Sequence, residues 1–292
     1  MSVSHLMSKM LHAARSEGTA VAAVNFYSFE SARGALLAAR DADRPVILAF
    51  GARYLKNLSL TQAAALARCC AEGLNVRWAL HLDHCSDLNV VRAAIDAGFD
   101  SVMYDGSALP FADNIRNTAQ VVSWAAERGA DVEAELGAVK TGAHSAEDSG
   151  SVELYTDPAQ AAEFVRCTGI DALAVSIGTV HGLYKGTPYI RLDILEAIRA
   201  AVDTPLVLHG ASGTGRGLLQ DTIRRGICKI NVNTELSMAG AAAAKELLDR
   251  EPAAHLSSLS LTITEAFRKA AESYMDLAAM KPEKRTSSAQ GE

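Results

Sequence analysis

Short apolar runs recur along the chain, and between them lie longer segments in which apolar residues are three and four positions apart. Several runs are continuously apolar, which is typical of parallel strands covered on both faces, whereas the longer segments are typical of amphipathic helices. The pattern predicts eight strands, at Val21–Phe26, Val46–Phe50, Trp78–His84, Ser101–Asp105, Val132–Leu136, Ala172–Ile177, Leu206–His209 and Lys229–Val232. The clearest predicted helices are Glu30–Ala42, Leu60–Glu72, Leu88–Ala97, Asn114–Arg128, Pro158–Thr168, Ile190–Ala201 and Leu218–Arg225.

Eight strand-then-helix units in a chain of 292 residues predict an α/β fold, a single (β/α)8 TIM barrel with extra C-terminal helices. The barrel domain is expected over residues 1–280, beginning with a short helix from His5 to Glu17 and closing with helices from Leu236 to Met280. Residues 281–292 are polar and are expected to form a disordered tail. A doubly wound open sheet is the alternative, but it calls for a Gly-x-Gly-x-x-Gly turn after an early strand, which the sequence lacks.

Composition narrows the classes of partner. The chain is 49% hydrophobic and carries a net charge of −6 without a long basic run, which argues against nucleic acid as a partner. No stretch approaches the roughly 20 apolar residues of a membrane span, and the N-terminus lacks the apolar core of a signal peptide. Five cysteines with no Cys-x-x-Cys pair fit a reducing compartment, so we expect a cytoplasmic protein with no membrane partner.

Histidine ends or follows three of the predicted strands. His84 and His209 end the third and seventh strands, and His181 follows the sixth. Because a barrel gathers the carboxyl ends of its strands on one rim, the three imidazoles are expected to lie close together. Three imidazoles with an open fourth position are a usual arrangement of catalytic zinc. For each histidine the alternative is a rim side chain bonded to a backbone carbonyl, so the prediction depends on the barrel assignment.

Acidic residues accompany these histidines on the predicted rim. Asp83, beside His84, is placed to move protons next to a metal. Asp105 and Glu135 lie at the ends of the fourth and fifth strands, and a second cation site, support of the metal ligands and simple ion pairing stay open for them. Glu133, two residues before Glu135, faces the same side of its strand and leaves the choice within that pair open.

Two further segments carry candidate chemistry. Gly213–Gly217 is glycine-rich and follows the seventh strand, where barrels commonly bind phosphate on backbone N–H groups. The long polar segment from Ala138 to Asp157 is expected to be an active-site lid or a surface excursion, and it carries Glu147. His81, three residues before His84, faces elsewhere on its strand and is expected to be structural.

Six segments together resemble the class II, metal-dependent ketose-bisphosphate aldolases, a family that includes fructose- and tagatose-bisphosphate aldolases. The resemblance runs along nearly the whole chain, from about Val21 to the C-terminal helices. The segments that carry it are Leu80–His84, Ala97–Met103, Val132–Gly137, His181–Lys185, Leu208–Gly213 and Lys229–Thr234. Taken jointly, these motifs are highly specific.

The resemblance implies roles for individual residues. His84, His181 and His209 would hold the catalytic zinc, Asp83 would be the general acid/base, and Asp105 and Glu135 would serve an auxiliary metal position. The residues implied to cradle a dihydroxyacetone phosphate moiety are Gly182, Lys185, Gly210, Ala211, Ser212, Asn231, Val232, Asn233 and Thr234. A monovalent cation, Na⁺ or K⁺, is a further implied ligand near the phosphate, and a homodimer or homotetramer is the family expectation.

The implied reaction is the reversible cleavage of a ketose 1-phosphate or 1,6-bisphosphate, fructose- or tagatose-bisphosphate-like, to dihydroxyacetone phosphate and an aldehyde. It would pass through a zinc-stabilised enediolate. In cleavage, Asp83 would take the proton of the C4 hydroxyl, and a carboxylate of the lid, carried over onto Glu147, would return the C3 proton. The aldehyde half of the substrate is left open.

The sequence departs from the family pattern in two places. The segment after Glu135 is longer than in the family, which affects the assignment of Glu147. Relatives that bind a distal sugar phosphate often place serine after the second strand and arginine in a late helix, where this chain has Gly51 and Thr264. We therefore expect a ketose 1-phosphate whose far end is not the usual phosphate. The alternative is that Arg53, Lys56 or Arg268 supplies the distal charge.

Two other functions compete with the aldolase. A metal-dependent sugar-phosphate isomerase or epimerase would also use enediolate chemistry, without cleavage of a carbon–carbon bond. A non-catalytic barrel subunit would activate a partner aldolase, and such a subunit would be expected to lose the histidines or Asp83. Because this chain keeps both, the sequence favours the aldolase, with a small sugar phosphate as its partner.

Overall fold

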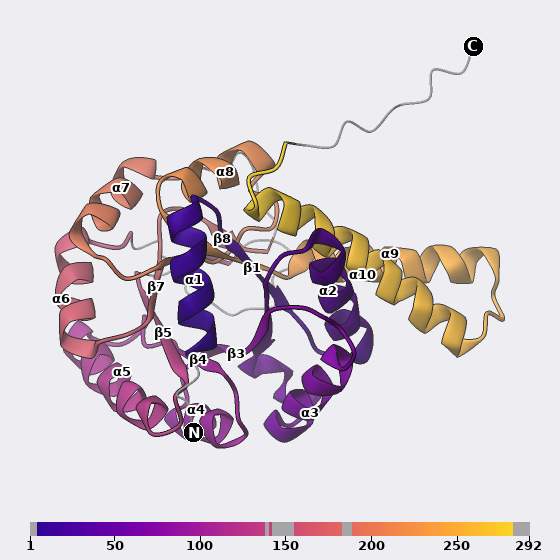
Figure 1. The fold of residues 1–292 in the computed structure, drawn as a ribbon, viewed down its shortest axis with the longest axis horizontal. Coiled ribbons are helices and arrows are strands. Elements are labelled where there is room, and N and C mark those ends of the chain that lie inside the picture. The colour runs from indigo at the N-terminus through magenta and orange to yellow at the C-terminus, as the bar shows by residue number, and fades with distance from the viewer. Residues whose placement is uncertain (1–4, 138–139, 142–154, 183–188, 283–292) are drawn as a thin grey trace, which may run out of the picture.

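A closed barrel of eight parallel strands forms the centre of the protein (Figure 1). The structure is a computed structural model that describes residues 5–137, 140–141, 155–182 and 189–282. The barrel strands are β1 (Val21–Asn25), β2 (Val46–Gly51), β3 (Trp78–Cys85), β4 (Ser101–Tyr104), β5 (Asp131–Leu136), β7 (Ala172–Val175), β9 (Leu206–Leu208) and β10 (Ile227–Val232). They pair in that order, and β10 returns to pair with β1, Lys229 opposite Val21. The predicted barrel is therefore confirmed, and the alternative of an open doubly wound sheet is wrong.

Helices between the strands cover the outside of the barrel (Figure 1). They are α2 (Phe29–Ala42), α3 (Leu60–Ala71), α4 (Leu88–Asp96), α5 (Phe111–Ala126), α6 (Pro158–Thr168), α7 (Leu192–Ala201) and α8 (Arg216–Arg224), with a 3-10 turn η1 (Ala52–Lys56) after β2. Ser28 and Ser59 begin α2 and α3 with capping boxes, and the Asp157 side chain caps α6. Outside the barrel, the short strands β6 (Lys140–Thr141) and β8 (Val180–His181) pair with each other. Sequence patterning predicted neither of these two strands.

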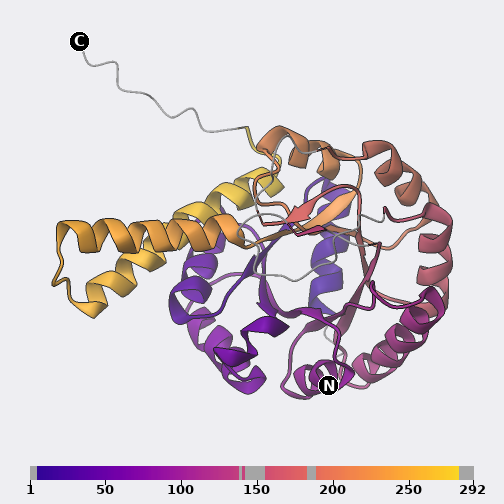
Figure 2. The same ribbon diagram turned by 180° about the vertical axis from the view of Figure 1, so that it is seen from behind.

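The last two helices form a hairpin that extends from the side of the barrel (Figure 2). They are α9 (Thr234–Arg250) and α10 (Leu256–Ala278). Helix α10 packs closely on α2 at Gly34, where a Cβ atom would lie 2.9 Å from the carbonyl oxygen of Thr264. Within the described residues, no helix is long and apolar enough to cross a membrane. The predicted tail lies outside the described residues from 283 onward.

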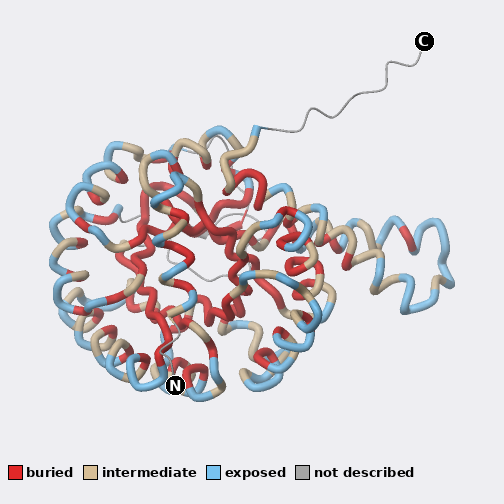
Figure 3. The backbone as a smooth tube through the Cα atoms, viewed as in Figure 1, coloured by how far each residue is buried: buried red, intermediate tan, exposed pale blue. Residues whose placement is uncertain are grey.

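The barrel strands and the helices around them differ in how far their residues are buried (Figure 3). The strands are buried, and the helices expose their outer faces. Helix α1 (Leu6–Glu17) lies across the barrel end where the strands begin, and its buried Met7 and Leu11 join an interior apolar cluster with Val21, Ile47 and Met103. Apolar side chains therefore fill the barrel interior at this end, whereas Asp83, His84 and His209 lie at the other end.

Candidate active site

The carboxylate of Asp83 lies buried at the end of β3, between two amides that come from β1 and β10 across the barrel. Asn25, at the end of β1, donates from Nδ2 to Asp83 Oδ2 over 2.8 Å. Asn231, in β10, donates from Nδ2 to Asp83 Oδ1 over 3.0 Å. Burial alone raises the pKa of Asp83, but the nearby imidazoles of His84 and His209 and the ammonium of Lys229 outweigh burial, and the pKa is lowered. Asp83 is thus held as a carboxylate in a fixed orientation.

His84 turns toward the same rim through a break in the strand. In β3 the side chains of His81 and Asp83 face the barrel interior, and Leu82 packs among the helices outside it. Simple alternation would send His84 outward as well. Its backbone is left-handed instead, with φ of 44°, and the pairing register with β4 shifts between Leu82 and Cys85. A positive φ is uncommon in a residue other than glycine and often marks a functional site.

His84 and His209 face each other across the rim. His84 Nε2 is 2.9 Å from His209 Nδ1. The outer ring nitrogen of each imidazole is held by a carboxylate, His84 Nδ1 at 3.1 Å from Asp105 Oδ2 and His209 Nε2 at 2.9 Å from Glu133 Oε1. If each outer nitrogen donates its proton to its carboxylate, both facing nitrogens present lone pairs. In that protonation state the two facing nitrogens repel each other unless both bind a cation.

Asp83 joins the two imidazoles in a set of donors of the kind that binds metal. One ligand atom from each of Asp83, His84 and His209 lies within 4.8 Å of the others. His84, Asp105 and Glu135 form a second such set beside it. Imidazole nitrogens with carboxylate partners behind them are the usual surroundings of zinc. The donor chemistry therefore fits the implied metal.

Asp105 has a clear positional role. Its Oδ1 accepts hydrogen bonds from Ser107, 3.1 Å from the backbone nitrogen and 2.6 Å from Oγ, while Oδ2 contacts His84 Nδ1. Although burial opposes it, hydrogen bonding to His84 and Ser107 holds the pKa of Asp105 well below its usual range. Glu135 is buried beside it, with Oε2 3.8 Å from His84 Nδ1. Asp105 therefore orients His84, whether or not the pair also holds a second cation.

A buried charged network lies beneath the rim. Lys229 in β10 donates from Nζ to Glu133 Oε2, and Nζ is 3.2 Å from His81 Nε2. His81 Nδ1 is 2.8 Å from Ser101 Oγ. Burial, together with Lys229, lowers the pKa of His81 to about 3, so this imidazole is neutral. The ammonium of Lys229 and the hydrogen bond from His209 outweigh burial and lower the pKa of Glu133. Glu133 thus connects a buried cation to His209.

The network divides Glu133 and Glu135 between the two histidines. Sequence spacing left the choice within this pair open, and the structure places Glu133 on His209 and Glu135 near His84. His81 contacts Ser101 and Lys229, and it belongs to none of the candidate metal-ligand sets among the described residues.

A small pocket adjoins Asp83 and His209 on the side of β10. Its lining residues are Asp83, Gly182, His209, Gly210, Ser212, Asn231, Asn233 and Thr234. Gly210 has φ of 71°, and a Cβ atom there would lie 2.3 Å from the carbonyl oxygen of Val180, so only glycine fits. Ala211 and Val232, also predicted here, are buried neighbours that pack in the core. The first turn of α9 begins at Thr234, which brings a helix N-terminus to the pocket, a position that favours anions.

Two buried amide oxygens lie in this pocket. Asn231 Oδ1 and Asn233 Oδ1 have no hydrogen-bond partner within the described part of the chain. Asn233 Nδ2 donates to Tyr54 Oη over 2.9 Å, which fixes that amide. Buried polar atoms of this kind are normally satisfied, so a ligand that donates hydrogen bonds or a cation fits the pocket.

Residues 5–282 match the sequence model of the family described as fructose-bisphosphate aldolase class-II. The chain belongs to this family. It is therefore a class II aldolase, a carbon–carbon lyase.

Solved structures agree with this membership. The YdjI aldolase of Escherichia coli K12 is 34% identical, with a TM-score of 0.83, and the match covers 93% of this chain and 96% of that one. A putative fructose-1,6-biphosphate aldolase of Coccidioides immitis is 28% identical, with a TM-score of 0.84 and coverage of 94% and 96%. The fructose-bisphosphate aldolase of Campylobacter jejuni, 22% identical with a TM-score of 0.78 and 93% coverage of both chains, shares the fold.

Not every residue predicted for this class II aldolase is placed by the structure. The backbone of His181 lies in β8 directly before Gly182, which lines the pocket. Lys185 and Glu147 lie outside the described residues. Glycine-rich Gly213–Gly217 contributes the start of α8, whose N-cap is Gly215.

Sequence reasoning missed Asn25, and the structure places it on Asp83. The signal was present, because asparagine is the one polar side chain in the apolar run Val21–Phe26. Buried polar residues of this kind need a partner, and the partner here is the proton-transfer candidate.

Proposed function

We propose that this aldolase is zinc-dependent and reversibly cleaves a ketose 1-phosphate or 1,6-bisphosphate to dihydroxyacetone phosphate and an aldehyde. The observation that carries the proposal is the facing pair of ring nitrogens on His84 and His209, each backed by a carboxylate, with Asp83 beside them. His84 Nε2 and His209 Nδ1 would be two zinc ligands, and His181 is the predicted third. Bound zinc supplies Lewis-acid stabilisation of the negative charge that develops on substrate oxygens.

Asp83 is the proposed general base of the cleavage direction. Its lowered pKa keeps it ionised, and the amides of Asn25 and Asn231 fix both of its oxygens. It would accept the proton of the C4 hydroxyl as the C3–C4 bond breaks, and would return that proton in the synthetic direction. Because the two amides restrict rotation of the carboxylate, little reorientation is needed at the moment of transfer.

The pocket beside Asp83 is the proposed site of the dihydroxyacetone phosphate moiety. Gly210 allows the backbone to approach closely, Ser212 offers a hydroxyl, and the N-terminus of α9 favours the phosphate. The buried oxygens of Asn231 and Asn233 suit hydroxyl donors of the substrate or a monovalent cation. Proton exchange at C3 by Glu147, a Na⁺ or K⁺ ion, a homodimer or homotetramer, and a cytoplasmic location stay predictions.

The far end of the substrate is proposed to lack the usual phosphate. Thr264, at the predicted arginine position, lies on α10 in the contact with α2. Arg268 is already paired with Asp41 and Glu265, at 2.6 Å and 2.7 Å. Arg53 and Lys56 are exposed on η1, directly after β2, and are the remaining cations for a distal phosphate.

A substrate comparison tests this proposal. Rates of dihydroxyacetone phosphate release from a ketose 1-phosphate and from fructose 1,6-bisphosphate are to be measured with a coupled assay, with and without a zinc chelator. We expect chelator-sensitive release and a kcat/KM for the 1-phosphate at least equal to that for the bisphosphate. A strong preference for the bisphosphate that Arg53→Gln or Lys56→Gln abolishes would overturn the proposal for the distal end. Interconversion of ketose and aldose without triose phosphate would support an isomerase instead.

A further inference from the structure

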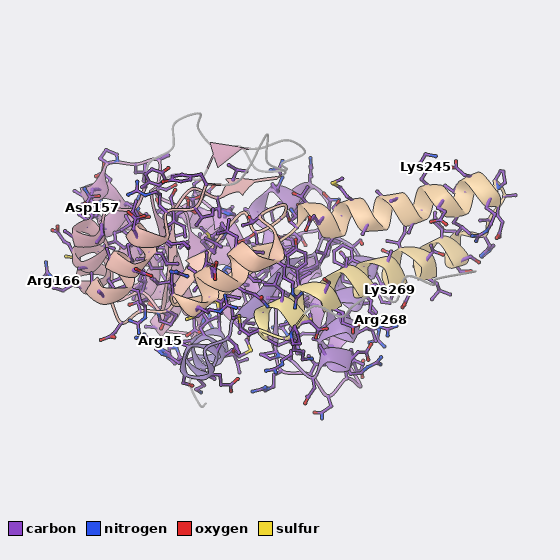
Figure 4. The ribbon with its side chains drawn as sticks, turned by 90° about the horizontal axis from the view of Figure 1, so that it is seen from above. Arg15, Asp157, Arg166, Lys245, Arg268 and Lys269 are labelled. Carbon is purple, nitrogen blue, oxygen red and sulfur yellow. The ribbon has the colours of Figure 1, made fainter. Side chains whose placement is uncertain are left out.

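A second pocket, of about 250 Å³, lies at the opposite end of the barrel from the candidate active site. It lies between the end of α1, the ends of α7 and α8, and the start of β10. Four arginines line it, Arg15, Arg199, Arg224 and Arg225, together with Gly18, Thr19, Ile223, Gly226, Ile227 and Cys228. We call it the arginine pocket. Arg15, on α1, is labelled in Figure 4.

The charge that lines the arginine pocket is entirely positive among the described residues. The acidic partners of these arginines lie outside the lining and are open to solvent. The side chain of Asp203 is 101% exposed, that of Glu196 is 60% exposed and that of Asp221 is 43% exposed. Water and salt screen the arginines as well, since Arg224 is 56% exposed, but three carboxylates serve four guanidinium groups, so a net positive charge remains at the pocket.

Backbone contacts hold three of the four guanidinium groups in place, and Arg224 bonds to the side chain of Asp221. Arg15 donates to the carbonyl oxygen of Asp203, and Arg199 donates to that of Val202 over 3.2 Å, both just after α7 ends. Arg225 donates to the carbonyl oxygen of Asp221 over 3.1 Å. A guanidinium has five N–H donors. Within the described chain, the hydrogen bonds of each of the four arginines engage at most two of its nitrogens.

Gly226 allows Arg199 to lie along the pocket wall. A Cβ atom at Gly226 would lie 2.6 Å from Arg199 Cδ, and φ of 112° at Gly226 is itself a conformation that favours glycine. The Arg199 stem is therefore packed against backbone rather than extended into solvent. Less conformational entropy remains to be lost when such a side chain binds a ligand.

From these contacts we infer that the arginine pocket binds the diphosphate group of a ligand, a compact oxyanion with several negative charges. Planar guanidinium forks match the oxygens of phosphate and bind them with charge-assisted hydrogen bonds. Four such groups around one pocket suit an anion with several negative charges better than a monoanion. The site is separate from the pocket that holds Asp83 and His209, and it carries no part of the aldol reaction.

Calorimetric titration with inorganic pyrophosphate tests the inference. The protein is to be treated with a chelator and dialysed first, so that binding of zinc by pyrophosphate contributes no heat. The wild-type chain is expected to bind, with affinity that falls as salt is raised. Arg199→Gln/Arg224→Gln is expected to weaken binding by about tenfold or more, because two guanidinium groups that donate charge-assisted hydrogen bonds to the anion are lost.

Two further variants serve as controls, one for misfolding of the double variant and one for the loss of any positive charge. Arg224→Gln alone removes a guanidinium whose only ion pair, among the described residues, is with Asp221 of its own helix, so the fold should be kept and binding should still weaken. Arg166→Gln removes an exposed arginine from the last turn of α6, outside the pocket, and should bind as the wild type does.

The outcomes separate the possible sources of the signal. ADP binding with no binding of adenosine supports recognition of the diphosphate group, whereas equal binding of adenosine contradicts it. Absence of binding to the wild type at about 1 mM pyrophosphate, or equal affinity in wild type and Arg224→Gln, would overturn the inference. The second result would show that the anion binds without Arg224, outside the arginine pocket.

Discussion

At the end where the strands begin, the barrel interior is filled by Met7 and Leu11 of α1, whereas at the end where they finish it holds Asp83, His84 and His209. The first end contributes stability through burial of apolar surface. At the second end, the polar side chains hold one another in place through hydrogen bonds. A buried carboxylate or imidazole without such a partner would raise the free energy of the folded state. The comparison indicates that Lys229 and Glu133, buried in the barrel between the two ends, fix the orientation of the site residues above them.

The largest expected effect comes from Asp83→Ala. Loss of the proposed base should lower kcat for cleavage by about 10²–10⁴-fold. Metal content should be kept, because His84 and His209 and their carboxylate partners are unchanged. Initial rates and zinc per chain are to be measured on the same sample. Asn25→Ala serves as the matched variant, with a smaller loss, since Asn231 still holds the other oxygen of Asp83. A kcat of Asp83→Ala within threefold of wild type (a roughly equal barrier) would contradict the assignment.

Lys229→Met tests the buried ion pair of Lys229 and Glu133, which lies in the barrel interior between the two ends. It leaves Glu133 without its ammonium partner in a fully buried place, which should lower the free energy of unfolding by about 3–5 kcal/mol. Zinc affinity should fall by about 10–100-fold as His209 loses its firm support. Denaturant unfolding and zinc titration give the two readouts. Lys229→Met/Glu133→Gln removes the unpaired charge and should recover part of the stability.

Leu11→Ala tests the apolar end. It removes a fully buried side chain from beneath the barrel and should lower the free energy of unfolding by about 2–5 kcal/mol. The kcat should stay near the wild-type value, because the described partners of Asp83, His84 and His209 lie at the other end of the barrel from α1. Thermal unfolding and steady-state rates at a temperature well below the transition measure both. A large fall in kcat without a fall in stability would show that the two ends are coupled.

The smallest effect is a pH dependence of stability from His81. Burial lowers its pKa to about 3 in the folded protein, against 6.5 for the ordinary side chain. Between these values the unfolded chain binds more protons, so the free energy of unfolding of the metal-free protein should fall as pH drops below 6.5. The slope from His81 is at most about 1.4 kcal/mol per pH unit, the value for one proton.

His209, whose pKa burial also lowers, adds a slope of the same sign. His81→Gln should therefore reduce the slope between pH 6.5 and 4.5 without abolishing it. Urea unfolding at several pH values measures it. An identical slope in the variant would show that His81 does not titrate in this way.

The sequence predicted the barrel because each strand and helix carries its own periodicity, and the rim because strand ends share one edge. His84, His209 and Asp83 follow from that logic. The left-handed turn at His84 could not be predicted, since it depends on a register shift against β4. Nor could the Glu133–Lys229 pair, because alternation shows which face a residue occupies but not which residue across the barrel it meets.

The sequence pattern also does not predict accurately where each helix begins. Helix α5 begins at Phe111, directly after Pro110, three positions before the predicted start at Asn114. The apolar spacing locates the body of a helix, whereas its first turn depends on capping and on proline.

The account depends most on His84 and His209 as ligands of one zinc ion, and zinc content tests this directly. Wild type, His209→Ala and His81→Gln are to be loaded with zinc, passed over a desalting column and assayed for metal per chain. His81 is the matched control, a buried histidine of the same barrel interior that is not among the candidate metal ligands of the described residues. We predict one zinc per chain in wild type and His81→Gln, and none in His209→Ala. Full zinc content in a folded His209→Ala would contradict the account.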